Sequence, residues 1–144
     1  MDYNTSFQIS ASGMAVEKLR LDVTALNLAN MSTTAASVDQ LYQPKRVLSG
    51  EATFNFSQQF DGQYSIQSGG ARILSVEAIT ASPKTVYEPG HPYADSKGFV
   101  SYPGINQSSE MVNMMTALRA YEANVVAMNA AKTMAARALE IGGQ

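Results

Sequence analysis

The chain has 144 residues and no cysteine, and its 10 basic and 12 acidic residues give a formal net charge of −2. This composition excludes disulfides and thiolate metal sites, and it provides no electrostatic footprint for nucleic acid or anionic membranes. No apolar run approaches the roughly 18 residues that would indicate a membrane span. The N-terminus lacks the pattern of a cleaved secretory signal. The charged fraction of 15% is low, which predicts that much of the surface is buried in contacts.

The first predicted element is a helix from Phe7 to Ala29, in which Gly13 is the only Gly or Pro. Two adjacent apolar seams run along it and form a stripe wider than one partner helix covers. The seams are Ile9, Ser12, Val16, Leu19, Val23 and Leu26, and Ala11, Met14, Leu21, Ala25 and Leu28. Gly13 costs about 1 kcal/mol relative to Ala, so the first turns are candidates for ordering only on contact. We expect the helix to end near Asn30, since Asn tolerates the left-handed conformation that closes many helices.

Asn27 lies near the end of this helix and admits two interpretations. The sequence alone favours a solvated or capping amide. The alternative is an amide that bonds across a helix–helix interface and fixes its register, which a single buried Asn can do.

The middle of the chain has strand and turn signals without a helical period. Residues 31–50 are predicted to be mostly loop, with residues 42–46 extended or in a turn. A strand is predicted over residues 72–80, before Pro83, and a short one over residues 98–102. These strands form a β module too small to be stable without the helices.

A hairpin is predicted earlier in this module. Residues 52–57 and 64–66 alternate between apolar and polar side chains, as strands do. A three-residue loop ending in Gly62 would place Phe56 opposite Ile66, so we expect that register.

The segment of residues 86–95 is dense in turn residues and holds the chain's one histidine, His91. A metal or acid–base site can be built from His91 with Glu88 and Asp95. Two prolines and a glycine separate these residues, however, and none of the usual ligand spacings appears. A rigid surface turn is the better account of the segment.

The last predicted element is a long helix with Ser108 or Ser109 as its N-cap and Glu110 at the positive end of the helix dipole. It continues to Ile141, where Gly142 and Gly143 end it, and would be roughly 48 Å long. Its main seam is Met111, Met114, Leu118, Tyr121, Val125, Met128, Lys132, Ala135 and Leu139. Three further apolar residues lie off this seam and require a second partner: Val112, Met115 and Val126.

Several stretches of the sequence carry a family resemblance. One, at residues 25–30, reads ALNLAN and resembles the N-terminal signature of flagellar rod, hook and hook-associated axial proteins. Another, at residues 86–100, reads VYEPGHPYADSKGFV and is similar to the segment typical of proximal rod proteins of the FlgC family. Residues 110–115 and 119–125, followed by Asn129 and Lys132, are similar to the C-terminal helix of the axial family. The resemblance spans nearly the whole chain.

This resemblance implies a structural protein of the bacterial flagellar basal body, not an enzyme, and it implies no cofactor. Such subunits pass unfolded through the type III export channel without a cleaved signal peptide and assemble in the periplasm. Their terminal helices form the inner tube of the rod, which transmits motor torque. The implied partners are copies of the chain, the rod proteins FlgB, FlgF and FlgG, the junction protein FliE and the export apparatus, with no nucleic acid and no membrane insertion.

We therefore expect an α+β fold in which long N- and C-terminal helices form an antiparallel, coiled-coil-like pair with a small β-rich module between them. The expected units are an N-terminal helix at 1–30, a loop and outer β module at 31–107, and a C-terminal helix at 108–144. No catalytic, cofactor-binding or metal residue is expected. The residues expected at subunit interfaces are Leu19, Leu21, Val23, Leu26, Asn27, Leu28, Asn30, Met111, Val112, Met114, Met115, Leu118, Tyr121, Asn124, Val125, Met128 and Leu139.

Three alternatives stay open on the sequence. The chain could be another flagellar axial subunit, although its short middle region leaves no room for the large outer domains of a hook protein. It could be a paralogue that serves a lateral flagellum. The third alternative is a small metal-binding protein that uses His91, which metal analysis of the purified protein would distinguish.

Overall fold

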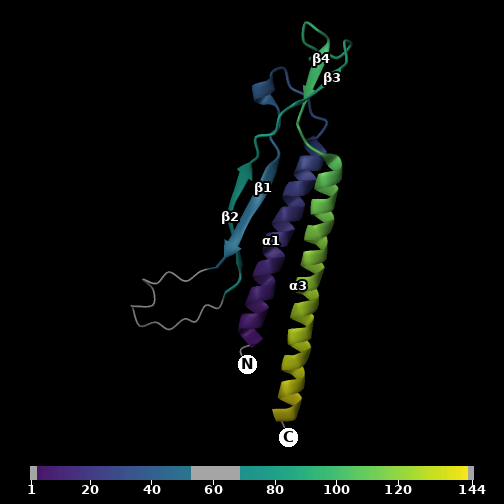
Figure 1. The fold of residues 1–144 in the computed structure, drawn as a ribbon. Coiled ribbons are helices and arrows are strands. Elements are labelled where there is room, and N and C mark those ends of the chain that lie inside the picture. Colours follow the sequence, from purple (N-terminus) through teal and green to yellow (C-terminus); the bar gives the residue numbers. More distant parts are fainter. Residues whose placement is uncertain (1–2, 53–68, 143–144) are drawn as a thin grey trace, which may run out of the picture.

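Two long antiparallel helices dominate the computed structural model, which describes residues 3–52 and 69–142 (Figure 1). Helix α1 spans Tyr3–Asn30 and helix α3 spans Gln107–Gly142. The β elements come between them in the sequence, so the predicted α+β fold with a helix pair and a small β module is confirmed. None of the helices that the structure describes has the length and apolar character needed to cross a membrane.

Two contacts set the register of the helix pair. Asn27 near the end of α1 donates a hydrogen bond to the carboxylate of Glu110 in the first turns of α3, at 2.9 Å. Near the middle of the pair, a Cβ atom added to Gly13 would lie 2.9 Å from the side-chain oxygen of Asn124. The less exposed positions of α3 recur in alternating four- and three-residue steps, as in a coiled coil. They include Glu110, Met114, Ala117, Tyr121, Asn124, Met128, Ala131 and Ala135.

This seam of α3 differs from the predicted one at every second position. Ala117 and Ala131 are buried, whereas Leu118, which the sequence pattern placed on the seam, is 46% exposed. The physical reason lies on α1, whose buried side chains facing α3 include the small Ser10 and Thr24. Small residues on both helices allow a close approach, so the larger side chains turn outward. The predicted seam was wrong at five positions, which lie off the observed seam: Met111, Leu118, Val125, Lys132 and Leu139.

A two-stranded antiparallel sheet lies along α1 on the side away from α3 (Figure 1). Strand β1 spans Lys45–Glu51 and strand β2 spans Ala71–Ala78. Lys45 lies opposite Ala78, and the register shifts between Leu48 and Ser49. The sequence predicted β2 but assigned β1 to a loop, which is wrong. The irregularity at Leu48 breaks the polar–apolar alternation by which a strand is found.

Strands β1 and β2, which we call the β1–β2 hairpin, cover a seam of α1 that the sequence had assigned to a helix contact. The hydroxyl of Ser12 accepts a hydrogen bond from the backbone N–H of Ala71 at 3.1 Å, and Arg20 donates one to the hydroxyl of Ser49 at 2.7 Å. Val16 and Val23, which share this side of the helix, are only 3% and 6% exposed. Their three-and-four spacing identifies a buried face correctly, but it does not tell a sheet from a second helix.

A second small sheet lies beyond the ends of the helices where α1 stops and α3 starts (Figure 1). Strand β3 spans Lys84–Tyr87 and pairs in antiparallel order with strand β4, Phe99–Tyr102. Val100 in β4 has no exposed surface. The prediction of a strand at 98–102 is confirmed, but Val86 and Tyr87, assigned to a turn, belong to β3. A 3-10 turn, η1, spans Val38–Gln40.

The hairpin predicted with Phe56 opposite Ile66 lies outside the described residues. At the helix ends, α1 stops at Asn30 as predicted, although not through a left-handed residue, since Gly98 alone has a positive φ in the described part of the chain. The predicted N-cap of α3 is also corrected. The side-chain oxygen of Asn106 accepts the backbone N–H of Ser109 at 3.1 Å, so Asn106 caps this helix.

Candidate subunit-interaction surface

The side chain of Asn27 joins three parts of the fold and is only 2% exposed. Its oxygen accepts hydrogen bonds from the Tyr42 hydroxyl and the Lys45 backbone N–H, both at 2.9 Å. Its nitrogen donates to the Lys45 carbonyl and to the Glu110 carboxylate, also at 2.9 Å. All four hydrogen-bonding positions of the amide are filled. The interpretation of Asn27 as a solvated amide is therefore wrong, and its bond across the helix pair is confirmed.

The Tyr42 hydroxyl is held in its protonated form by the same surroundings. Burial raises the pKa of Tyr42, and the negative charge of Glu110 raises it further. Tyr42 therefore keeps the proton that it donates to Asn27. One side chain of α1 thereby fixes the chain entering β1 against the start of α3.

An apolar strip runs along the helix pair on the side turned away from the β1–β2 hairpin. On α1 the strip consists of large apolar residues spaced seven apart. The register of the helix pair places a large apolar residue of α3 beside each of them. We call these six residues the apolar face: Met14 with Val125, Leu21 with Leu118, and Leu28 with Met111.

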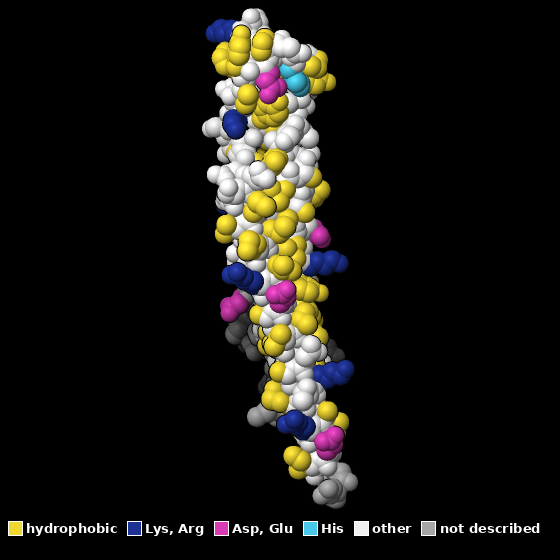
Figure 2. All heavy atoms as spheres, turned by 90° about the vertical axis from the view of Figure 1, so that its right-hand side faces the viewer, with side chains coloured by type: hydrophobic (Ala, Val, Ile, Leu, Met, Phe, Trp, Pro, Cys, Tyr) yellow, Lys and Arg dark blue, Asp and Glu magenta, His cyan; other side chains and the backbone are white. Residues whose placement is uncertain are grey.

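Figure 2, which views the pair from the α3 side, shows hydrophobic side chains forming a band along the length of the molecule. Within the apolar face, Met111 and Leu118 are 51% and 46% exposed, and the other four members are half-buried. Met115 and Val126 widen the band on α3 and are also exposed. The chain therefore leaves uncovered a strip of large apolar side chains that a neighbouring helix could cover.

The residues predicted at subunit interfaces divide into an inner and an outer group. Val23 and Asn27 are buried inside the chain. Half-buried residues on the hairpin side of α1 or on the α3 seam are Leu19, Met114, Tyr121, Asn124 and Met128. Those on the outer faces or at the helix ends, half-buried or exposed, are Leu21, Leu26, Leu28, Asn30, Met111, Val112, Met115, Leu118, Val125 and Leu139.

Sequence reasoning missed three residues that organise this surface. Gly13 permits a close approach of the two helices, since a Cβ atom there would lie 2.9 Å from the Asn124 side chain. Tyr42 and Glu110 complete the hydrogen bonds of Asn27. A glycine inside a helical pattern is a signal for close packing, whereas nothing local distinguishes Tyr42 from other loop tyrosines.

The candidate metal ligands take part in three separate local contacts. Asp95 accepts the backbone N–H groups of Lys97 and Phe99 at 2.8 and 2.9 Å, and these bonds lower its pKa. Glu88 accepts the Tyr102 hydroxyl, and the Nδ1 atom of His91 accepts the backbone N–H of Tyr93. In the described part of the chain, no three His, Asp or Glu side chains are grouped to hold a metal ion.

Comparison with known proteins places both helices in one group. The family described as "Flagella basal body rod protein" matches residues 7–36, and the family described as "Flagellar basal body rod FlgEFG protein C-terminal" matches residues 96–141. Over 136 residues the chain is 37% identical to the flagellar basal-body rod protein FlgC of Salmonella typhimurium, covering 94% of this chain and 95% of that protein. The chain belongs to the FlgC family of flagellar basal-body rod proteins.

Other FlgC proteins match to a similar extent. That of Bacillus subtilis is 37% identical over 144 residues, covering 95% of this chain and 96% of the relative. That of Borreliella burgdorferi is 34% identical over 146 residues and covers 95% of each. As a FlgC-family member, the chain is a structural subunit of the flagellar basal-body rod. Its helix pair and apolar face are accordingly considered as parts of an assembly.

Proposed function

We propose that this FlgC-family chain enters the rod by packing its apolar face against helices of neighbouring subunits. The observation that carries the proposal is the exposure of Met111 and Leu118, each near one half, on a helix whose seam toward α1 is already filled. Fully burying a Leu or Met side chain stabilises a contact by about 1.5–3 kcal/mol. Covering the exposed half of each contributes roughly 1 kcal/mol per side chain.

Membership in the family supports different roles for the helices and for the middle segment of the chain. The helices at 1–30 and 108–144 form the inner tube of the rod, and the segment 31–107 carries the outer β module. The hairpin covers one side of α1, so the opposite side of the pair is the one left for neighbours. The role is structural, with no catalysis and no cofactor.

The partners that fit this role are copies of the chain, FlgB, FlgF and FlgG, the junction protein FliE and the flagellar export apparatus. We place the chain in the part of the basal body that spans the periplasm, reached by export without a cleaved signal peptide. Neither nucleic acid nor membrane insertion belongs to this function. The near-neutral charge of −2 suits a contact dominated by apolar surface.

The experiment replaces Leu118 by Asp in cells that depend on this chain for motility. A carboxylate in the centre of the apolar face would have to be buried without a partner, so rod assembly and motility are lost while export continues. Ala127→Asp is the matched control, because Ala127 is exposed on the same helix but off the apolar face. Val125→Asp is a second variant of the face. Motility that survives both Leu118→Asp and Val125→Asp would overturn the proposal.

A further inference from the structure

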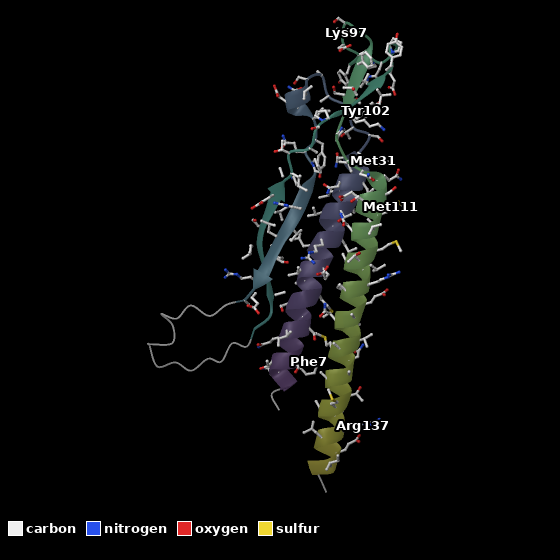
Figure 3. All side chains as sticks on the ribbon, viewed as in Figure 1. Phe7, Met31, Lys97, Tyr102, Met111 and Arg137 are labelled. Atoms are coloured by element: carbon white, nitrogen blue, oxygen red, sulfur yellow. The ribbon has the colours of Figure 1, made fainter. Side chains whose placement is uncertain are left out.

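Helix α3 extends beyond the start of α1. The register of the pair places Tyr3, the first described residue of α1, across from Met134, so residues 135–142 have no part of α1 beside them. Figure 3 shows Arg137 on α3 beyond the level of Phe7 in α1. Ile141 in this extension is 81% exposed. Within the described part of the chain, residues 136–142 of α3 are all exposed.

One exposed row of this part of α3 lies beside the seam that faces α1 and not on it. Its four residues follow in steps of four, three and four, so they lie on one side of the helix. Met134 and Ile141 supply apolar surface, and Arg137 lies between them. All four are exposed, and we call them the α3 outer row: Ala130, Met134, Arg137 and Ile141.

Helix α1 carries a row of the same spacing on the side away from α3. Its members are small or charged and follow in steps of four, three and four. Asp22 is the second member of this row and Arg137 the third member of the other, so the two meet when the rows are aligned in antiparallel order. All four are exposed, and we call them the α1 outer row: Lys18, Asp22, Ala25 and Ala29.

We propose that the α3 outer row packs in antiparallel order against the α1 outer row of a second copy of this chain, with Arg137 opposite Asp22. In this alignment Ala130 meets Ala29, Met134 meets Ala25, and Ile141 lies along the stem of Lys18. The two large apolar side chains, Met134 and Ile141, thus lie opposite a small residue and an alkyl stem, and Arg137 and Asp22 pair by charge. The inference rests on the proposed function, because it describes how one copy meets another in the assembly.

Charge complementarity between the two outer rows favours a second copy of this chain as the partner. Within the described residues, neither Asp22 nor Arg137 has an ion-pair partner in its own chain. The alignment pairs them and also brings Glu140, which flanks the α3 row, toward Lys18. An exposed ion pair contributes only about 0.2–1 kcal/mol, so it fixes the register while Met134 and Ile141 supply buried apolar area.

The alignment requires both copies to have the same orientation, because α3 is antiparallel to α1 within each chain. Ala29 is level with Ser108 of its own chain but would be level with Ala130 of the other copy. At 1.5 Å per residue, the two copies are displaced by roughly 33 Å along the helices. Such a contact joins different surfaces of identical subunits and does not close on itself, so it extends into an open helical array.

Disulfide trapping tests this alignment directly, because the chain has no native cysteine. A double variant, Ala29→Cys with Ala130→Cys, is oxidised in isolated basal bodies. The two positions are roughly 33 Å apart within one chain, so any disulfide between them joins two copies. The control is Ala29→Cys with Ala123→Cys, which lies on the same side of α3 one heptad earlier and is also exposed. We expect a covalent dimer from the first pair and none from the control.

Charge reversal tests the register in the same Ala29→Cys, Ala130→Cys background. Arg137→Asp or Asp22→Arg alone should lower the dimer yield about two- to fivefold, and the two together should restore it. Absence of the dimer, equal yields from both cysteine pairs, or an adduct only with a different protein would overturn the inference. If Leu118→Asp still abolishes rod assembly in that case, the proposed function stands and this contact alone is wrong.

Discussion

The amide of Asn27 in the last turns of α1 donates a hydrogen bond to the carboxylate of Glu110 in the first turns of α3, at 2.9 Å. The same amide bonds both the N–H and the carbonyl of Lys45. Helix pairing and placement of the β1–β2 hairpin are thus coupled at one buried point. The hairpin covers one side of α1 and α3 covers another, so the apolar face is defined by what these two contacts leave free.

Replacing Asn27 by Ala should destabilise the chain by about 1–3 kcal/mol, because Lys45 and Glu110 lose partners in a buried place. Urea unfolding of the purified protein measures the change. Asn30→Ala is the control, since within the described residues the Asn30 side chain bonds only the Leu26 carbonyl of its own helix, near solvent. Its effect on the free energy of unfolding should stay within about 0.5 kcal/mol. Equal effects of the two substitutions would contradict the role given to Asn27.

Replacing Gly13 by Val should force α1 and α3 apart, because even a Cβ atom there lies 2.9 Å from the Asn124 side chain. We expect a loss of about 1–3 kcal/mol, against the gain in helix propensity that a non-glycine residue brings. Ala15→Val is the control at an exposed position of the same helix. Combining Gly13→Val with Asn124→Ala should recover part of the loss; no recovery would show that the two residues are not in contact.

Tyr42 should make stability depend on alkaline pH. Its pKa is raised above 10.0 by burial first and by Glu110 second, so its contribution is fully present below pH 10.0 and is lost as pH rises through the folded-state pKa. Tyr42→Phe removes this dependence and costs about 0.5–1.5 kcal/mol through the lost hydrogen bond to Asn27. Unfolding curves across alkaline pH measure both. An unchanged alkaline profile in the variant would refute the assignment.

Asp95 should titrate below its ordinary value of 3.8, because the backbone N–H groups of Phe99 and Lys97 stabilise its charged form. Its contribution to the turn is present above that value and disappears as pH falls through the lowered folded-state pKa. The amide NMR signals of Lys97 and Phe99 should follow this titration. Asp95→Asn should abolish it. A midpoint at or above 3.8 would be inconsistent with the observed bonds.

The sequence was sufficient for both helices because their periodicity is local and uninterrupted. It could not show that the seam through Val16 and Val23 faces a sheet, since a buried helix face has the same spacing whether it packs against a sheet or against another helix. It placed Leu118 on the α3 seam because a larger apolar residue is the usual choice there. The helices approach closely at Gly13, and the small Ala117 is buried on the seam in place of Leu118. This packing is visible only in the folded helix pair.

The candidate surface was predicted in part. The expectation of a second row on α3 pointed to Val112, Met115 and Val126, all of which are exposed. The expectation for Val23 and Asn27 did not anticipate that the chain's own hairpin and second helix bury them. Strand β1 was missed for a related reason, because its partner β2 is separated from it in the sequence and its own alternation is irregular.

The most direct test of the central claim is an electron cryo-microscopy map of the basal body that resolves this chain's helices. The account predicts that Leu21 and Leu118, side by side on the apolar face, are buried against a helix of a neighbouring subunit while the β1–β2 hairpin lies on the opposite side of α1. A map in which Leu118 faces solvent or the open channel, with neighbours contacting only the hairpin, would contradict it.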